Sequence, residues 1–526
     1  MIECIGSIDQ GTQSTRFFLY AKDCSVLASC QVPVPQIYPR AGWVEQEPEQ
    51  LWRSVVEAIN GAMQEAKERH GGITVKAIGL TNQRETTIVW DKNTGKPLHN
   101  AIVWLDSRTS QLCARMAEQR SEGHDAFRPI TGLPISTYFS AYKLKWLIEN
   151  VPEVCTAVDE GRCMFGTVDT WLLYNLTGGT VHITDVSNAS RTNLMDISSL
   201  QWHAETINAF GVANVVLPEI KSNAEEYGRV VVGAARNNAS ATRHLQQQQL
   251  TSDLDNVPIS GCLGDQQAAM MGQRCVEAEA KNTYGTGCFM LLNTGTAPVP
   301  SSHGLLTTVA YKLGPQAPAY YALEGSIAIA GQGISWLRDA LGCIDSAAES
   351  EGLAASVPDT GGVFFVPAFG GLLAPYWAPD ARGVILGLTQ HTTRAHIVRA
   401  MLEAICFQTR DVVEAMRQDA DMSHLACLFV DGGASQNNLL MQMQADVLQV
   451  GVRRPEHMET TSLGAALAAG IAVGFWTVEE AFHDQKHESG GTLFEPVWEK
   501  GVAERRYGRW KKAVERSMGL AEITDD

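Results

Sequence analysis

The chain has 526 residues, of which 45% are hydrophobic and 19% charged, and its formal net charge at pH 7 is −17. A chain of this length exceeds what one hydrophobic core usually supports, so we expect two large domains. The acidic charge argues against nucleic acid as the main partner, because no basic field would attract a polyanion. A small anionic ligand is still compatible with this charge, since backbone N–H groups can bind it locally.

The twelve cysteines are scattered from Cys4 to Cys427, without a CxxC pair or a cluster of the metal-binding type. Several lie in apolar runs, where cysteine behaves as a small hydrophobic residue, and this usage is typical of a reducing compartment. The most apolar stretch, residues 463–475, is too short to cross a bilayer and is predicted to be a buried helix. The N-terminus carries no evident secretory signal. We therefore expect a cytoplasmic protein without a transmembrane segment.

The first predicted element is a hairpin, in which two strands flank a tight turn. An apolar run around Ile5 and Ile8 precedes the turn, and strand character resumes at Arg16. Gly11 allows positive φ there, while Asp and Thr side chains can hydrogen-bond the turn backbone. The tip would present N–H and O–H donors that hold phosphate, with Asp9 beside it to bind magnesium. An ordinary hairpin with a polar tip explains this stretch equally well.

Strands and helices then alternate along the first half of the chain, which indicates α/β layers. Apolar residues recur with helical spacing in three stretches, 50–68, 107–120 and 140–158. Strand patterns occupy 74–80, 86–91 and 101–104.

The composition changes over residues 235–256, where asparagine and glutamine replace large apolar residues. We interpret this stretch as an exposed insertion at the domain boundary, and we divide the chain into residues 1–256 and 257–526. The second half contains another strand, glycine turn and strand at 281–294, and a glycine-rich strand end at 428–434. Two domains that each present such a turn to a shared cleft could hold both ends of a triphosphate.

The motifs of several other enzyme classes are absent. The sequence has no GxxxxGK[ST], no GxGxxG that opens a helix after a strand, no kinase-type His-Arg-Asp loop and no HExxH. The remaining carboxylates and hydroxyl-bearing turns suit phosphoryl transfer, which depends on positioning, magnesium and hydrogen-bond donors. Asp265 is the candidate general base, because it follows Gly264 at the start of a predicted helix and can approach a ligand there. The alternative role for Asp265 is a plain helix N-cap.

Arg84 and Glu85 form a second candidate pair, directly after a predicted strand. Neighbouring side chains of a strand point to opposite faces, so both can meet one ligand only at a strand end or bend. A guanidinium and a carboxylate together match the vicinal hydroxyls of a polyol. The alternative is an exposed ion pair of little energetic consequence. Three aromatic residues near these motifs could form apolar walls for a carbon chain or could belong to the core: Trp104, Tyr138 and Phe289.

At these motifs the sequence resembles the FGGY carbohydrate kinases of the actin-like ATPase superfamily, over nearly the whole chain. The resemblance rests on separate blocks at residues 7–12, 81–87, 131–134, 138–141, 166–171, 184–192, 264–267 and 281–289, with the two FGGY signature regions at 138–150 and 383–403. It implies an α/β protein of two ribonuclease H-like domains around an interdomain cleft. The first domain would bind glycerol and the second ATP, and the γ-phosphoryl group of ATP would pass to glycerol.

The resemblance also implies roles for individual residues, carried over position by position. Glycerol would contact Arg84, Glu85, Trp104, Tyr138, Asp265, Gln266 and Phe289. The nucleotide phosphates would lie among Thr12, Gln13, Ser14, Thr286 and Gly287. The adenosine pocket would be lined by Gly331, Ser335, Gly433 and Asn437. Asp265 would take the proton of the attacking hydroxyl, with Arg16 near the transferring group and Asp9 joining Asp265 at a magnesium ion.

Two alternatives to this function stay open. Another FGGY polyol or ketose kinase would need a longer pocket with more hydrogen-bonding groups than Arg84 and Glu85 supply. A non-catalytic actin-like ATPase scaffold would bind a partner in a nucleotide-dependent way, without a small acceptor. Members of the family are generally homo-oligomers, so the resemblance implies a homodimer or a homotetramer.

Overall fold

The computed structural model describes residues 2–233, 250–423, 425–456, 458–482 and 491–524. Most of the expected insertion at 235–256 therefore lies outside the described residues, and its end is described from Leu250 onward. Leu250 and Leu254 are both buried in the core of the first half. This end of the stretch is consequently part of the packed structure, which differs from the exposed insertion that its composition predicted.

The first half is built on a six-stranded sheet with the order β13-β14-β5-β1-β2-β3. Its strands are β1 (Ile2–Gln10), β2 (Ser14–Tyr20), β3 (Val26–Pro33), β5 (Ile73–Asn82), β13 (Ala224–Arg229) and β14 (Pro258–Gly264). β1 is antiparallel to β2 and parallel to β5, and β5 is parallel to β14. β1 and β5, which are mostly buried, carry the predicted phosphate turn and the Arg84–Glu85 bend at their carboxyl ends.

The second half repeats this arrangement in a seven-stranded sheet with the order β17-β18-β16-β15-β21-β22-β23. Its strands are β15 (Ala280–Tyr284), β16 (Cys288–Gly295), β17 (Leu306–Lys312), β18 (Ala319–Ile327), β21 (Cys427–Asp431), β22 (Gly451–Arg454) and β23 (Thr492–Phe494). β15 is antiparallel to β16 and parallel to β21, just as β1 is to β2 and β5. The two glycine hairpins thus occupy equivalent places in two similar sheets, and the predicted two-domain α/β fold is confirmed.

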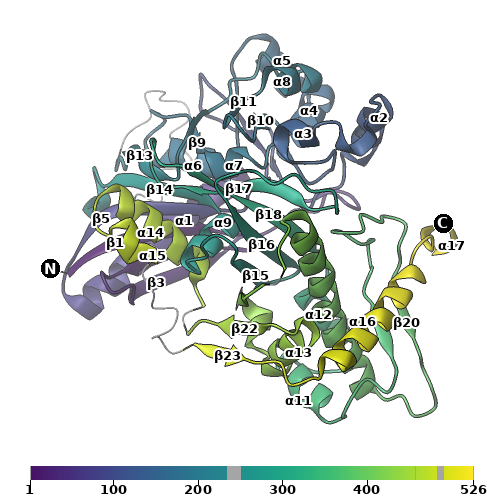
Figure 1. Ribbon diagram of the computed structural model, residues 1–526. Helices are drawn as coiled ribbons and strands as arrows, with labels where there is room; N and C mark the ends of the chain where they lie inside the picture. The colour runs from purple at the N-terminus through teal and green to yellow at the C-terminus, as the bar shows by residue number, and fades with distance from the viewer. Residues whose placement is uncertain (1, 234–249, 424, 457, 483–490, 525–526) are drawn as a thin grey trace.

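Long helices cover these sheets where the sequence shows helical periodicity. α1 (Pro48–His70) begins with proline in its first turn, ends at Gly71 in the left-handed conformation and buries Leu51, Val55 and Ile59. α12 (Arg394–Asp419) is the corresponding long helix of the second half and is buried along most of its length. Figure 1 shows α12 beside α13 (Asn438–Leu448) and α16 (Lys500–Glu515).

A smaller helical layer follows the Arg84–Glu85 bend and has its own apolar core. Its helices are α2 (Ser110–Glu118), α3 (Arg128–Thr131), α4 (Ser140–Asn150), α5 (Pro152–Asp159) and α8 (Ala204–Phe210). The single helical stretch predicted at 140–158 is two helices, because the chain is extended at Val151 and Pro152 starts a new first turn.

The remaining elements are short or connect these layers. The strands are β4 (Glu45–Gln46), β6 (Ile88–Asp91), β7 (Ala101–Ile102), β8 (Cys163–Gly166), β9 (Ile183–Asp185), β10 (Met195–Asp196), β11 (Gln201–Trp202), β12 (Glu219–Lys221), β19 (Phe364–Val366) and β20 (Val384–Leu386). The helices are α6 (Val168–Leu176), α7 (Val186–Ala189), α9 (Asp265–Gly272), α10 (Gly331–Asp339), α11 (Glu349–Ala355), α14 (Thr460–Ala472), α15 (Val478–Phe482) and α17 (Ala521–Thr524).

The pairing of β14 corrects the division of the chain at residue 257. β14 is hydrogen-bonded to β5 in the first sheet, and the second sheet begins only with β15. α14, the buried helix predicted at 463–475, comes from late in the chain but packs on β1, β5 and β14; Figure 1 shows it, in yellow-green, against the first sheet. The first half therefore ends after α9.

Among the described residues, none of the helices combines the length and the apolar character that a membrane crossing requires.

Candidate active site

The tips of the two glycine hairpins face one cavity of about 560 Å³. Gln13 from the first hairpin and Thr286 from the second both line it, together with residues of α10, α11 and the turn before α13. The four residues predicted for adenosine lie on its wall: Gly331, Ser335, Gly433 and Asn437. Thr12, Ser14 and Gly287 are the chain neighbours of Gln13 and Thr286 in the same turns. The structure therefore brings the predicted nucleotide residues of both halves together, while their roles stay predictions.

The second hairpin is fixed by close backbone contacts. The N–H groups of Gly331 and Gln332, in the first turn of α10, donate to the carbonyls of Gly285 and Thr286 at 3.0 Å. A β-carbon on Gly331 would lie 2.6 Å from the Gly285 oxygen, and one on Gly287 would lie 2.3 Å from the Ile327 oxygen. Glycine is needed at 331 and 287 because no side chain fits.

The first hairpin closes differently from the prediction. Gly11 does not adopt the positive φ that glycine allows, and its N–H donates to the Ser14 carbonyl at 2.9 Å. The Thr12 carbonyl accepts a hydrogen bond from Gln46 Nε2 at 2.7 Å. Trp104 Nε1 donates to Thr12 Oγ1 at 2.9 Å, so the tip is joined to the predicted glycerol residues.

Three aromatic rings gather beside this tip. The Trp104 ring lies 5.6 Å from the Tyr138 ring and 5.7 Å from the Phe289 ring, in edge-to-face arrangements. Phe289 belongs to β16 of the second half, whereas Trp104 and Tyr138 belong to the first. All three residues are half-buried rather than core, so they leave apolar ring surface accessible between the two halves.

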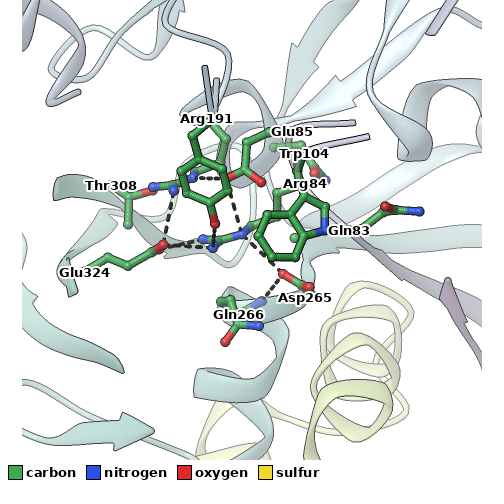
Figure 2. Close-up of polar contacts among 12 residues, drawn as sticks. Gln83, Arg84, Glu85, Trp104, Arg191, Asp265, Gln266, Thr308 and Glu324 are labelled. Carbon is green, nitrogen blue, oxygen red and sulfur yellow. Dashed lines mark hydrogen bonds and ion pairs between the residues drawn. The ribbon is translucent and has the colours of Figure 1, made fainter. Parts of the chain in front are cut away.

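Arg84 and Glu85 lie in a bend after β5, and each side chain is only 2% exposed. The alternative of an exposed ion pair is therefore wrong. Arg84 donates from Nη1 and Nη2 to the two carboxylate oxygens of Glu324, at 2.6 and 2.8 Å. Arg191 donates from Nε to Glu85 Oε1 at 2.7 Å and from Nη2 to Glu324 at 3.1 Å. Figure 2 shows these four residues as one connected network.

Asp265 stands at the edge of this network. Its Oδ1 lies 3.2 Å from Arg84 Nε, and its side chain is 29% exposed. Gly264 is the N-cap of α9 and Asp265 is the first helical residue, so the plain N-cap role is wrong. The Gln266 N–H donates to Asp265 Oδ1 at 2.7 Å. Burial raises the pKa of Asp265, while the positive charge of Arg84 lowers it.

Asp9 and Arg16 occupy the two sides of the first hairpin. Asp9 is 9% exposed, and burial raises its pKa to about 7, with Arg16 opposing and the charges of Glu459 and Asp265 adding to the shift. Arg16 Nη1 forms an ion pair with Glu459 Oε2 at 3.0 Å. The Asp9 carboxylate accepts no hydrogen bond among the described residues. Asp9 and Asp265 influence each other electrostatically, and carboxylates are the donor type that magnesium prefers.

Four charged residues of the site were not assigned roles from the sequence: Lys281, Arg191, Glu324 and Glu459. Arg191 lies inside the block 184–192, but nothing local distinguishes it from a surface arginine. Glu324 offered a usable signal, because a carboxylate within the apolar strand at 319–327 is rarely buried without a partner. Lys281, fully buried on β15, donates to Gln266 Oε1 and to Thr283 Oγ1. Its contact leaves the amide nitrogen of Gln266 facing away from the ammonium group.

Comparison with known families gives two matches along the chain. The N-terminal domain of the FGGY family of carbohydrate kinases matches residues 4–272, and the C-terminal domain of that family matches residues 280–473. The interval between the matches coincides with the passage from α9 to β15. The family models and the sheet pairing therefore agree on where the halves divide.

Several named proteins are similar over nearly their full length. The chain is 51% identical to glycerol kinase of Arabidopsis thaliana, covering 99% of this chain and 98% of the relative. It is 48% identical to glycerol kinase of Brucella anthropi, covering 99% and 100%.

Solved structures give the same picture for the fold. The crystal structure of Plasmodium falciparum glycerol kinase with ADP superposes with a TM-score of 0.88 at 40% identity, covering 98% of each chain. A gluconate kinase from Lactobacillus acidophilus superposes with a TM-score of 0.80 at 19% identity, covering 99% of this chain and 98% of the other, which shows the fold alone.

Proposed function

The chain belongs to the FGGY family of carbohydrate kinases, and we propose that it transfers the γ-phosphoryl group of ATP to glycerol, giving sn-glycerol 3-phosphate and ADP. The observation that carries this proposal is the 3.2 Å contact between Arg84 and Asp265 beside a three-ring aromatic wall. It puts a hydroxyl-binding cation next to a carboxylate that can act as a base. The similarity to glycerol kinases over the whole chain supports the same acceptor.

The acceptor end combines polar groups with aromatic surface. Glu85 Oε1 accepts from Arg191, whereas its Oε2 has no hydrogen bond among the described residues, so it can accept one from a hydroxyl of glycerol. Arg84 Nη2 donates to the Tyr138 hydroxyl at 3.4 Å, and Gln266 adds an amide. Trp104, Tyr138 and Phe289 would contact the carbon chain. A three-carbon alcohol supplies hydroxyls for these polar groups and only a short carbon chain for the aromatic rings.

Asp265 would take the proton of the attacking hydroxyl as the O–P bond forms. Its position at the first residue of α9, with one oxygen held by Arg84 and the Gln266 N–H, fixes the carboxylate for this task. Because an anhydride is exchanged for an ester, the reaction at equal concentrations favours glycerol 3-phosphate. Closure of the two halves would exclude water as a competing acceptor.

The nucleotide would occupy the cavity between the hairpin tips. The turns at Thr12, Gln13, Ser14, Thr286 and Gly287 would surround the phosphates, with Gly331, Ser335, Gly433 and Asn437 around adenosine. Arg16 would approach the transferring group, with Glu459 holding its guanidinium until then. Asp9 and Asp265 would hold the magnesium ion, whose charge supports phosphoryl transfer when it is bound.

An acceptor panel tests the proposed function. The purified chain, supplied with ATP and magnesium, is assayed with glycerol, dihydroxyacetone, erythritol and xylulose in a coupled ADP assay. We expect kcat/KM for glycerol to exceed that for erythritol and xylulose by about 100-fold, because the longer acceptors meet the aromatic walls.

Two outcomes would contradict the proposed phosphorylation of glycerol. A higher kcat/KM for erythritol or xylulose would indicate a different FGGY polyol or ketose kinase. If no acceptor is phosphorylated and calorimetry detects no glycerol binding, the chain is a non-catalytic scaffold of the actin-like type.

We also predict a homodimer or a homotetramer in the cytoplasm, as the family resemblance implies. Size-exclusion chromatography with light scattering measures the oligomeric state. A fluorescent fusion imaged in cells shows the location.

A further inference from the structure

Glu324 lies on the face of the second sheet that packs against the first half. Along β18 it is paired with Leu291 of β16 and Leu306 of β17, which belong to apolar clusters shared with the first half. The next residue, Gly325, faces the opposite way, toward Val412 of α12. Because side chains alternate along β18, the Glu324 carboxylate of the second half points into the first half.

Every described hydrogen-bond partner of this carboxylate belongs to the first half. Glu324 is fully buried and accepts two hydrogen bonds from Arg84 and one from Arg191. Arg191 in turn donates to Glu85, and its guanidinium carbon lies 5.5 Å from the centre of the Tyr138 ring. Glu324 thus reaches three proposed glycerol contacts, one directly and two through Arg191. Figure 2 shows its links to Arg84 and, through Arg191, to Glu85.

Within the group of Arg84, Arg191, Glu85 and Glu324, the charges balance when Glu324 is ionised. Arg84 and Arg191 bring two positive charges, and Glu85 and Glu324 bring two negative ones, all at 0–2% exposure. Burial alone would raise the pKa of Glu324, but Arg191 and Arg84 outweigh burial and lower it to about 2. If Glu324 were absent, the acidic partners left to Arg84 would be Glu85 and Asp265. The two carboxylate oxygens that accept from Arg84 Nη1 and Nη2 would be lost.

We propose that Glu324 and Arg191 are positioning residues that hold Arg84, Glu85 and Tyr138 in the orientation that binds glycerol. Both residues are fully buried, so we assign neither a direct contact with glycerol. Because Glu324 comes from the second half, the acceptor site is complete only when that half is docked on the first. This inference rests on the proposed function and extends it to residues outside the acceptor contacts.

The test compares two buried carboxylates replaced by amides of the same shape. Glu324→Gln removes the charge and one acceptor from the network. Asp411→Asn is the matched control, because Asp411 is also buried but accepts from Tyr507 and Trp510 at 2.7 and 2.9 Å, outside the acceptor site. Both variants are assayed for KM of glycerol, KM of ATP and the rise in melting temperature that glycerol causes without ATP.

For Glu324→Gln we expect KM for glycerol to rise about tenfold or more, with KM for ATP changed by less than about twofold. The glycerol-induced rise in melting temperature should shrink in parallel. Asp411→Asn should lower the melting temperature of the free protein and leave both KM values near wild type. Two results would show that Glu324 has no positioning role. In the first, Glu324→Gln raises both KM values equally. In the second, it raises the KM for glycerol no more than Asp411→Asn does.

Arg191→Lys provides a second variant in case Glu324→Gln does not fold. Lysine keeps the positive charge but cannot span Glu85 and Glu324 with one planar fork. We expect about a tenfold rise in KM for glycerol, and an unchanged KM would overturn the proposal. A wild-type chain that fails to phosphorylate glycerol refutes the proposed function instead, so the two failures are distinguishable.

Discussion

Asp265 is subject to opposing electrostatic influences. Burial raises the pKa of its carboxyl and Glu85 adds to this rise, whereas the positive charges of Arg84 and Lys281 lower it. A carboxylate in this balance is more basic than a fully solvated aspartate. A raised basicity suits a general base that takes a proton from an alcohol.

Replacing the base should separate chemistry from binding. Asp265→Asn keeps the shape and the Gln266 contact but cannot take a proton, so we expect kcat to fall by about 10²–10⁴-fold. The affinity for ADP, measured by calorimetry without magnesium, should change little because the nucleotide cavity is lined by other residues. A variant with near-normal turnover would show that another group is the base.

The pH dependence of kcat/KM for glycerol should report the same carboxyl. A base must be ionised, so activity is lost as pH falls through its pKa, and a raised pKa moves this loss above the pH typical of aspartate. Lys281→Met removes a charge that lowers the pKa, so the acidic limb should shift to higher pH. Lys312→Met is the control, since Lys312 donates to carbonyls at 314–317, away from the site. A limb that stays in place or shifts downward would contradict the assignment.

At the scale of elements, turns and helix starts could be predicted from the sequence, whereas strand partners distant in the chain could not. The two glycine hairpins and the start of α9 follow from turn residues and periodicity within short windows. β14 was assigned to the wrong half because its partner, β5, lies about 180 residues earlier in the chain, and no local pattern records that register. The partners of Glu324 could not be predicted for the same reason, since Arg84 and Arg191 are separated from it by 240 and 133 residues.

The approach of α10 to the second hairpin gives a prediction at this scale. In Gly331→Ala the new β-carbon would lie 2.6 Å from the Gly285 oxygen, so α10 must move away from the hairpin tip. We expect KM for ATP to rise about tenfold while KM for glycerol changes little, because only the nucleotide cavity is displaced.

Gly352→Ala in α11 is the control for this substitution. Nothing lies within 4 Å of a β-carbon at Gly352, and alanine is favoured over glycine in a helix by about 1 kcal/mol. The control should be as stable as wild type or more so, with unchanged KM values. Equal KM values for ATP in Gly331→Ala and wild type would show that α10 does not shape the nucleotide site.

At the scale of the whole molecule, the two halves are joined by helices in backbone contact. α14 returns from the second half to cover the first sheet and crosses α9, which carries Asp265. The crossing is closer than side chains allow: a β-carbon on Gly464 would lie 1.9 Å from the Ala268 oxygen, and one on Gly272 would lie 1.9 Å from the Thr460 oxygen. The position of the proposed base thus depends on a helix almost 200 residues later in the chain.

Gly464→Ala should therefore affect stability and catalysis together. Overpacking at the crossing must displace α9 from α14, and we expect the free energy of unfolding to fall by about 1–3 kcal/mol. Because α9 begins at Asp265, kcat/KM for glycerol should also fall, by about tenfold or more. Gly508→Ala in α16, where nothing lies within 4 Å of a β-carbon, should leave stability and activity at or above wild type. Urea unfolding and steady-state kinetics on the same preparations measure both effects. A Gly464→Ala protein that is destabilised yet fully active would show that the base is positioned independently of this crossing.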